Sequence, residues 1–234
     1  MVTAVEAERD AVLAGLADAG FGAEEARTQL IGPLPLVTVA GPGGCSIAVV
    51  AGGVGPAAAA ASTATVLAAL DELPDLVVSA GIAGAFAGRA EIGDLVVADV
   101  FAAADLGADS DEGFLDLDTL GFGSSTLPAV VLELFVPGLS TAIVGPVLTV
   151  STATGSDARA ADLARRHGAV AEAMEGFGVA TAARLHQLPA AELRGISNRV
   201  GRRDRAAWDV PTALAAVRRG AAGLAALTRT GGRP

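Results

Sequence analysis

The sequence contains no lysine, because all 16 of its basic residues are arginine. This absence excludes enzymes that hold pyridoxal or a substrate carbonyl as a Schiff base, and it excludes a Walker-type phosphate loop. Only one cysteine, Cys45, is present, which excludes an internal disulfide and fits a reducing compartment. The two histidines, His167 and His186, are far apart in sequence, and with one cysteine they offer no zinc-ligand spacing. We therefore expect neither a cofactor nor a metal.

Positive charge is also scarce. The 26 acidic residues outnumber the 16 basic ones and give a net charge of −10, which argues against a broad nucleic-acid-binding surface. Residues 28–70 carry no charge, but the longest piece of them without Gly or Pro, residues 57–70, is shorter than the roughly 20 residues that span a membrane. Charged residues begin at Glu6, so the N-terminus does not read as a signal peptide. We expect a cytoplasmic protein with one domain over residues 1–234, which binds neither nucleic acid nor membrane.

Short β-branched runs alternate with alanine-rich runs along the chain. This pattern predicts an α/β fold, a three-layer α/β/α domain around one twisted mixed sheet. We expect residues 81–84 to form a turn after a strand, and residues 105–128 to form a mobile loop. The strands are predicted at 2–5, 36–40, 47–51, 75–79, 95–104, 141–151, 169–174 and 193–197, and the helices at 6–19, from 56, at 156–168, at 175–187 and from 208.

Four residues follow predicted strands closely: Glu8, Gly81, Glu175 and Asn198. In open α/β sheets ligands bind at the carboxyl ends of the strands. The sequence therefore predicts that these four residues lie on one side of the sheet.

The same places carry a family pattern. The chain resembles the superfamily of nucleoside phosphorylases and hydrolases, which includes the methylthioadenosine/S-adenosylhomocysteine nucleosidases. The resemblance covers most of the chain and rests on six segments in the right order: Ala4-Val5-Glu6-Ala7-Glu8, Gly53-Val54-Gly55, Ser79-Ala80-Gly81-Ile82-Ala83-Gly84, Ile92-Gly93-Asp94-Leu95-Val96-Val97, Ala173-Met174-Glu175 and Ile196-Ser197-Asn198.

Within that superfamily the C-terminal stretch resembles the futalosine hydrolases. This resemblance implies hydrolysis of the N-glycosidic bond of futalosine, with release of hypoxanthine and dehypoxanthine futalosine, in the futalosine pathway of menaquinone biosynthesis. It also implies a small purine nucleoside as the partner and a homodimer or larger homo-oligomer. The residues that carry it are Ile196-Ser197-Asn198, Val200-Gly201, Arg203-Asp204-Arg205 and Trp208.

Cleavage of an N-glycosidic bond develops positive charge on the ribose and negative charge on the departing purine, so it needs a base for water, acceptors for the ribose hydroxyls and a partner for the purine. The resemblance places Glu8 at the position of the family's water-activating glutamate. By spacing alone Glu6 is equally available, and either could be a solvated glutamate that favours a helix start.

Glu175 is the candidate ribose ligand. It lies where a predicted strand becomes a helix, so the helix dipole favours its ionised form, and a carboxylate can accept from two adjacent hydroxyls. Met174 resembles the family methionine that packs on the sugar. The alternative is a glutamate at a helix start beside a core methionine.

Asn198 is the candidate that reads the base and assists its departure. The adenosine-type nucleosidases of the family carry Asp at this place. An amide cannot act as that acid, but it can donate to O6 of a 6-oxopurine while its carbonyl accepts from N7–H. A hypoxanthine leaving group fits this pattern. The alternative is an asparagine that closes a turn after a strand.

The choice between water and phosphate depends on a missing arginine. Phosphorylases of the superfamily hold phosphate with an arginine two residues before the Gly-x-x-Gly turn, and here Ser79 stands at that position before Gly81. Without a charge-assisted clamp, phosphate binds weakly. Ser79 and Gly81 are therefore expected to face the substrate of a hydrolase, although another arginine could replace the missing one.

Residues 199–205 form the densest run of charge in the chain. Arg203 or Arg205 could bind the carboxylate of the substrate, because a guanidinium matches its geometry, while the alternative is a solvated loop with local ion pairs. No aromatic residue that could stack on the base is evident at 151–154, so Phe177 and Trp208 remain as candidates.

Other functions stay open. A phosphorylase of inosine or guanosine, or a nucleosidase for methylthioadenosine-type nucleosides, would use much of the same site, and phosphate dependence separates the first of these from a hydrolase. A non-catalytic nucleoside-binding protein would not need Glu8. A serine hydrolase lacks its Gly-x-Ser-x-Gly sequence here, and a dinucleotide-binding fold lacks the third glycine after Gly53 and Gly55.

Overall fold

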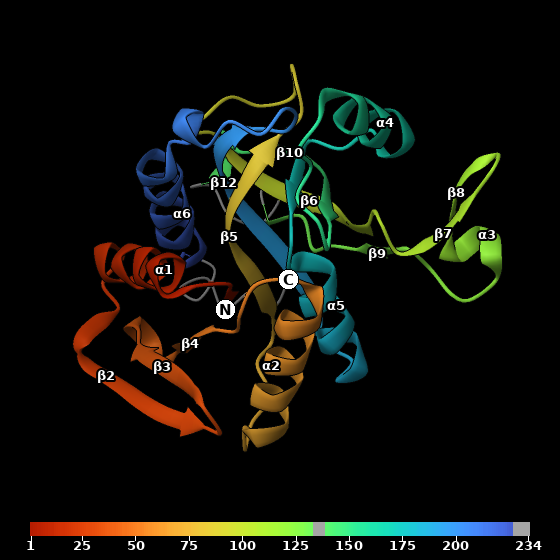
Figure 1. Cartoon of the computed structure of the whole chain (residues 1–234). Coiled ribbons are helices and arrows are strands. Elements are labelled where there is room, and N and C mark those ends of the chain that lie inside the picture. The colour runs from red at the N-terminus through yellow and green to blue at the C-terminus, as the bar shows by residue number, and fades with distance from the viewer. Residues whose placement is uncertain (133–138, 227–234) are drawn as a thin grey trace.

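The computed structural model describes residues 1–132 and 139–226 (Figure 1). Within these residues, none of the helices combines the length and the apolar character that crossing a membrane requires. The helices are α1 (Glu6–Asp18), α2 (Pro56–Ala69), α3 (Leu117–Leu120), α4 (Asp157–His167), α5 (Gly176–Leu185) and α6 (Val210–Leu224), with short 3₁₀ turns η1 (Pro42–Gly44) and η4 (Arg205–Ala207).

A ten-stranded mixed sheet forms the centre of the molecule, as the sequence predicts. Its strands follow the order β11-β10-β6-β12-β5-β1-β4-β3-β2, β9 pairs with β6, and β11 pairs with β5 as well as β10. This second pairing of β11 closes part of the sheet on itself. The strands are β1 (Val2–Thr3), β2 (Gly22–Ile31), β3 (Leu34–Ala40), β4 (Ser46–Ala51), β5 (Val77–Ala85), β6 (Leu95–Ala103), β9 (Thr126–Pro128), β10 (Ile143–Thr149), β11 (Ala171–Ala173) and β12 (Ala190–Arg199).

Two pairs of helices cover the sheet, α1 with α6 on one face and α2 with α5 on the other (Figure 1). Glycine sets the distance within each pair. A Cβ atom at Gly15 of α1 would collide with the carbonyl oxygen of Arg218 in α6, and one at Gly178 of α5 would collide with that of Pro56 in α2. The expected three-layer arrangement is therefore confirmed, with closer helix contacts than an alanine would permit.

Residues 81–84 do not form the turn predicted from their glycines. They lie inside β5, where β12 pairs with them on one side and β11 pairs with Gly84 on the other. Both positions of the strand require glycine, because side chains occupy the space that a Cβ atom would fill. These side chains are Glu8 and Arg194 at Gly81, and Asn198 at Gly84.

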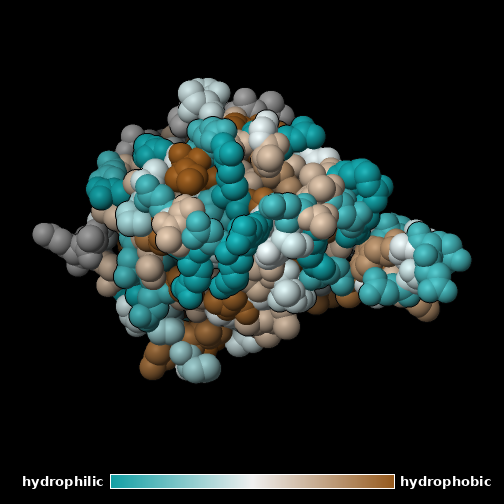
Figure 2. Space-filling model, turned by 45° about the horizontal axis from the view of Figure 1, so that its top comes forward, coloured by the Kyte–Doolittle hydropathy of each residue, from teal (hydrophilic) through white to brown (hydrophobic). Residues whose placement is uncertain are grey.

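The prediction that residues 105–128 form a loop is also wrong. They form a hairpin of β7 (Gly107–Ser110) and β8 (Gly113–Asp116), then α3 and β9, and the hairpin and α3 project from the body as an arm (Figures 1 and 2). Asp116 caps α3 through Thr119, and the guanidinium of Arg166 in α4 lies 4.7 Å from the ring centroid of Phe114. The local cap and this cation–π contact stabilise the segment. Its glycines and acidic residues are typical of loops, which is why the sequence predicted an irregular structure.

Helix ends were easier to predict than turns. Ser156 caps α4 through the backbone N–H of Arg159, and the helix ends at Gly168 in the left-handed conformation, both as expected. On β12 the register with β5 shifts by one residue between Ile196 and Asn198, so that Asn198 pairs with Gly84. This β-bulge places Asn198 at the end of the sheet where the site forms.

We predict that Gly15→Ala lowers the free energy of unfolding although alanine favours helix by up to ~1 kcal/mol. The added methyl group must push α1 away from α6, and overpacking of this kind costs about 1–3 kcal/mol. Urea unfolding measures the difference. Gly22→Ala is the matched control, because a Cβ atom at Gly22 meets no atom within 4 Å. Equal stability of both variants would contradict the tight α1–α6 contact.

Candidate active site

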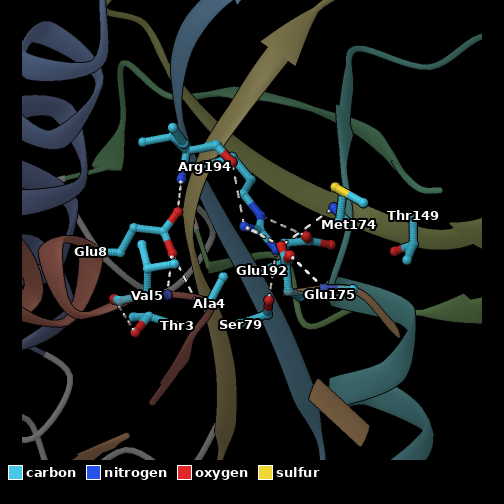
Figure 3. Close-up of polar contacts among 12 residues, drawn as sticks. Thr3, Ala4, Val5, Glu8, Ser79, Thr149, Met174, Glu175, Glu192 and Arg194 are labelled. Carbon is cyan, nitrogen blue, oxygen red and sulfur yellow. Dashed lines mark hydrogen bonds and ion pairs between the residues drawn. The ribbon is translucent and has the colours of Figure 1, made fainter. Parts of the chain in front are cut away.

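A buried guanidinium, that of Arg194 in β12, lies at the centre of a cluster of carboxylates (Figure 3). Its Nε donates to Glu192 at 2.8 Å, its Nη2 donates to Ser79 at 2.9 Å, and its Nη1 lies 3.2 Å from Glu175. Burial alone would lower the pKa of Arg194, but the carboxylates of Glu192, Glu175 and Glu8 outweigh it and raise the pKa above its usual value. The arginine therefore stays charged, pairs directly with Glu192 and Glu175, and adds its positive charge near Glu8.

Glu8 reaches this cluster from the first turn of α1. Its Oε2 accepts from the backbone N–H groups of Ala4 at 2.9 Å and Val5 at 3.3 Å, and its Oε1 accepts from that of Ile82 at 2.8 Å. Glu8 is 4% exposed, whereas Glu6 is exposed and pairs with Arg9. Of these two glutamates, only Glu8 points toward the cluster.

Gly81 of β5 is the floor between Glu8 and Arg194. A Cβ atom there would lie 2.5 Å from Oε1 of Glu8 and 2.7 Å from Nη1 of Arg194. The glycine thus allows a base and a cation to approach the same point of the strand. Ser79, two residues earlier, is buried and accepts from Arg194, so it contacts the cluster through its hydroxyl.

Glu175 directly precedes α5, at the transition from strand to helix that the sequence predicted, and its side chain makes no hydrogen bond to the first turn of that helix. Its Oε1 accepts from the backbone N–H of Gly55, and its Oε2 accepts from that of Met174 and pairs with Arg194. Gly55 has a φ of 92°, a conformation that favours glycine and turns its N–H toward the carboxylate. Two loops far apart in sequence therefore fix one carboxylate that is 7% exposed.

Asn198 lies further along β12, beside a cavity of about 180 Å³. Its Oδ1 accepts from the hydroxyl of Ser197 at 2.8 Å and its Nδ2 donates to the carbonyl of Arg199 at 3.0 Å. These partners fix the orientation of the amide and leave one acceptor position and one donor free for a ligand. The cavity is lined by Ile92, Thr154, Asn198, Arg199, Gly201, Arg202, Arg203, Asp204, Ala207 and Trp208.

Of the two arginines predicted to bind a carboxylate, Arg203 lines this cavity and Arg205 does not. The guanidinium of Arg203 lies 5.9 Å from the ring centroid of Trp208, and both side chains face the cavity. Arg205 is exposed at the start of η4. Phe177 packs against a core cluster under α2 and α5, so Trp208 is the candidate aromatic that the structure places at the cavity.

A second buried glutamate supports the rim of the cavity. Glu172 of β11 accepts from the backbone N–H of Thr154 at 2.8 Å and from its hydroxyl at 2.5 Å. Burial raises the pKa of Glu172, and the hydrogen bonds from Thr154 oppose this shift. Met174, two residues later, is half-buried and packs against the core cluster that contains Leu148, Val150 and Val200.

Three buried charged residues at the site escaped the sequence prediction: Glu172, Glu192 and Arg194. Glu172 and Arg194 lie within predicted strands, and Glu192 directly precedes the strand predicted at 193–197. Glu192 and Arg194 are two residues apart, so in a strand they share one face, and opposite charges on a buried face indicate a paired site. This alternation was the available signal for the Arg194 cluster.

The family model described as the phosphorylase superfamily matches residues 2–230. The futalosine hydrolase of Streptomyces coelicolor is 58% identical over 172 residues, 71% of this chain and 73% of that protein. That of Acidothermus cellulolyticus is 54% identical over 147 residues, 59% of each protein.

Solved structures share the fold at low sequence identity. A 5′-methylthioadenosine/S-adenosylhomocysteine nucleosidase of Helicobacter pylori, complexed with butyl-thio-DADMe-Immucillin-A, superposes with a TM-score of 0.80 at 18% identity, over 98% of this chain and 96% of that one. The futalosine hydrolase of Helicobacter pylori strain 26695 gives 0.79 at 18% identity over the same shares. The match over nearly the whole chain and the identity to curated relatives agree: the chain belongs to the phosphorylase superfamily and, within it, to the futalosine hydrolases.

Proposed function

We propose that this protein hydrolyses the N-glycosidic bond of futalosine and releases hypoxanthine and dehypoxanthine futalosine, a step of menaquinone biosynthesis. Two curated relatives with this name are more than half identical to the chain over the matched parts. The observation that carries the proposal is the position of Glu8, a buried carboxylate held by three backbone N–H groups beside Arg194 and Gly81. This arrangement suits a base that takes a proton from water.

In the proposed reaction the bond between the ribose C1′ and N9 breaks as water approaches C1′. Glu8 takes a proton from this water, the oxygen bonds to C1′, and the electron pair of the broken bond leaves with the purine, which takes a proton from solvent at N7 and departs as neutral hypoxanthine. Glu175 accepts from the ribose hydroxyls while Met174 packs on the sugar. Ser79 and Gly81 form the floor beneath, because the hydroxyl of Ser79 holds Arg194 and Gly81 leaves room for Glu8.

Charge favours water over phosphate as the nucleophile. The one buried arginine of this cluster is already committed to Glu192 and Glu175, with Glu8 close by. A phosphate ion placed here would face carboxylates on several sides without a free guanidinium to bind it. Arg194, which could have replaced the missing phosphate-binding arginine, is therefore already paired. This agrees with the presence of Ser79 at the position where phosphorylases carry that arginine.

Asn198 would read the purine at the cavity. Its free Nδ2 hydrogen can donate to O6 of the bound nucleoside, and its free Oδ1 lone pair can accept from N7–H once N7 has taken a proton from solvent as the bond to N9 breaks, so one amide spans both groups of the departing hypoxanthine. The departing base carries negative charge, which the donor to O6 stabilises. Gly84, which meets Asn198, is three residues from Gly81 along β5, or about 10 Å. A nucleoside can bridge that distance.

The remaining substituent of the substrate would meet the loop after β12. Trp208 and Arg203 line the cavity together, and Arg203 has no ion pair among the described residues. A guanidinium of this kind can bind a carboxylate in a bidentate manner. We assign the substrate carboxylate to Arg203 first and to Arg205 only if the loop rearranges.

The assembly and the compartment are part of the proposal. We propose a homodimer or larger homo-oligomer that acts in the cytoplasm on a small nucleoside, without a cofactor or a metal. The arm carries Phe122, 79% exposed, which an interface would cover. The single cysteine fits a reducing compartment.

The decisive test is release of hypoxanthine from futalosine, with and without phosphate. We expect equal rates and no ribose 1-phosphate-type product. Glu8→Gln should lower kcat by about 10²–10⁴-fold with little change in KM, because an amide cannot take a proton from water. Glu6→Gln is the matched control and should keep the wild-type rate, since Glu6 is exposed. A strict phosphate requirement would establish a phosphorylase instead.

Glu175→Ala should affect ribonucleosides more than 2′-deoxynucleosides, because the lost contact is to the hydroxyls. The ratio of kcat/KM for futalosine over its 2′-deoxy analogue should fall by about 10-fold or more, the usual value of a hydrogen bond to a charged group. Rates with both substrates in wild-type and variant give this ratio. Equal losses on both substrates would mean that Glu175 acts through Arg194 and not through the sugar.

Asn198→Asp should shift preference from the 6-oxo to the 6-amino purine. Facing a 6-amino group, the Nδ2 of Asn198 meets a second donor, and an unpaired buried polar group costs about 1–3 kcal/mol. We therefore expect the ratio of kcat/KM for futalosine over its 6-amino analogue to fall by about 10- to 100-fold in the variant. Proportional loss on both substrates would show that Asn198 does not read the base.

A further inference from the structure

Glu192 of β12 is a buried acid without an assigned role in the reaction. Its side chain is 0% exposed, its Oε1 accepts from Nε of Arg194 at 2.8 Å, and its Oε2 has no hydrogen-bond partner among the described residues. A carboxyl group in such a place is expensive to bury, and a chain that only needed to fill space would carry an apolar residue there. The unpartnered oxygen indicates a role beyond packing.

The surrounding backbone is built to accommodate this carboxyl group. Gly176, the first residue of α5, has no side chain, and a Cβ atom there would collide with both oxygens of Glu192. Glycine is a weaker helix former than alanine, by roughly 1 kcal/mol in a helix interior, so helix propensity does not account for glycine at this position. The glycine is explained by Glu192, 16 positions later in the sequence, which occupies the space that a methyl group would fill.

Arg194 connects Glu192 to the ribose ligand. The groups that face Glu192 are Arg194 on its own strand, Glu175 at the start of α5 and, through the guanidinium, Ser79 of β5 and Glu8 of α1. One positive charge therefore serves two carboxylates directly. When Glu192 is neutral, the positive charge of Arg194 is balanced by Glu175 alone. When Glu192 is ionised, the same positive charge is balanced by both carboxylates.

We propose that Glu192 is a positioning residue that sets, through Arg194, how much negative charge remains on Glu175 beside the ribose. The proposal rests on the proposed hydrolysis of a nucleoside. Ionised Glu192 adds one negative charge to the cluster, and the ribose becomes positive only as the glycosidic bond breaks. The added charge therefore stabilises the transition state more than the bound substrate, so that it raises kcat with little effect on KM.

The direction of the pH dependence follows from burial. Burial raises the pKa of Glu192 from 4.5 to about 7, with Arg194 opposing this shift and Glu175 adding to it. Below this value the carboxyl group holds its proton, and above it the group is ionised. The proposal therefore requires kcat to increase as the pH rises through about 7, the range in which the cluster gains its charge.

The experiment compares wild-type, Glu192→Gln and Glu6→Gln in futalosine hydrolysis between about pH 6 and pH 8.5. Glutamine keeps the shape of Glu192 and the acceptor for Arg194, but it stays neutral. We expect kcat of the wild-type to rise about tenfold across this range, and that of Glu192→Gln to remain at the low-pH level of the wild-type. Glu6→Gln should keep the rise, because Glu6 is exposed and pairs with Arg9 and not with Arg194.

Three outcomes separate the possibilities. Loss of the rise in Glu192→Gln alone, with KM unchanged within about twofold, supports the proposal. Persistence of the rise in Glu192→Gln, or its loss in Glu6→Gln instead, overturns the role of Glu192 and leaves the hydrolase function intact. A wild-type protein that does not hydrolyse futalosine at any pH overturns the proposed function, and the role of Glu192 falls with it.

Discussion

The pairing of Arg194 with buried carboxylates is the interaction on which the site depends. Three acidic side chains converge on one end of the sheet, and without a cation between them their mutual repulsion and loss of water would be prohibitive. Arginine is suited to this place because it stays charged when buried and offers donors in several directions. Lysine, which the chain lacks altogether, would present a single ammonium group that loses its proton more readily on burial.

One strand carries most of the machinery. Glu192, Arg194, Ser197 and Asn198 all belong to β12, which lies between β5 and β6 within the sheet. Strand residues vary less in position than loop residues, so the distance between the charged cluster and the amide at the cavity is set by backbone geometry. The loop after β12 carries Arg203 and Trp208, which line the cavity, and loops of this kind vary more readily than the strands that hold them.

Prediction from sequence succeeded where the determinants are local. The cap at Ser156 and the glycine at Gly168 predicted α4, and the transition from strand to helix predicted the place of Glu175. It failed where partners are distant in sequence. Gly81 and Gly84 resembled turn residues because the side chains that occupy their space come from positions 8, 194 and 198. Arg194 was missed for the same reason, since its partner Ser79 is 115 residues away.

The β-bulge at the end of β12 has a consequence for how base selectivity can change. With a regular register, residue 198 would pair with Ala85 and its side chain would alternate onto the face that packs the alanine-rich core. The extra residue turns the amide toward the cavity instead. A deletion of one residue in this stretch would withdraw the amide without any substitution at Asn198. Given the role proposed for Asn198, related chains could diverge in the purine they accept through the length of this segment, and an alignment scored only by residue identity would overlook the change.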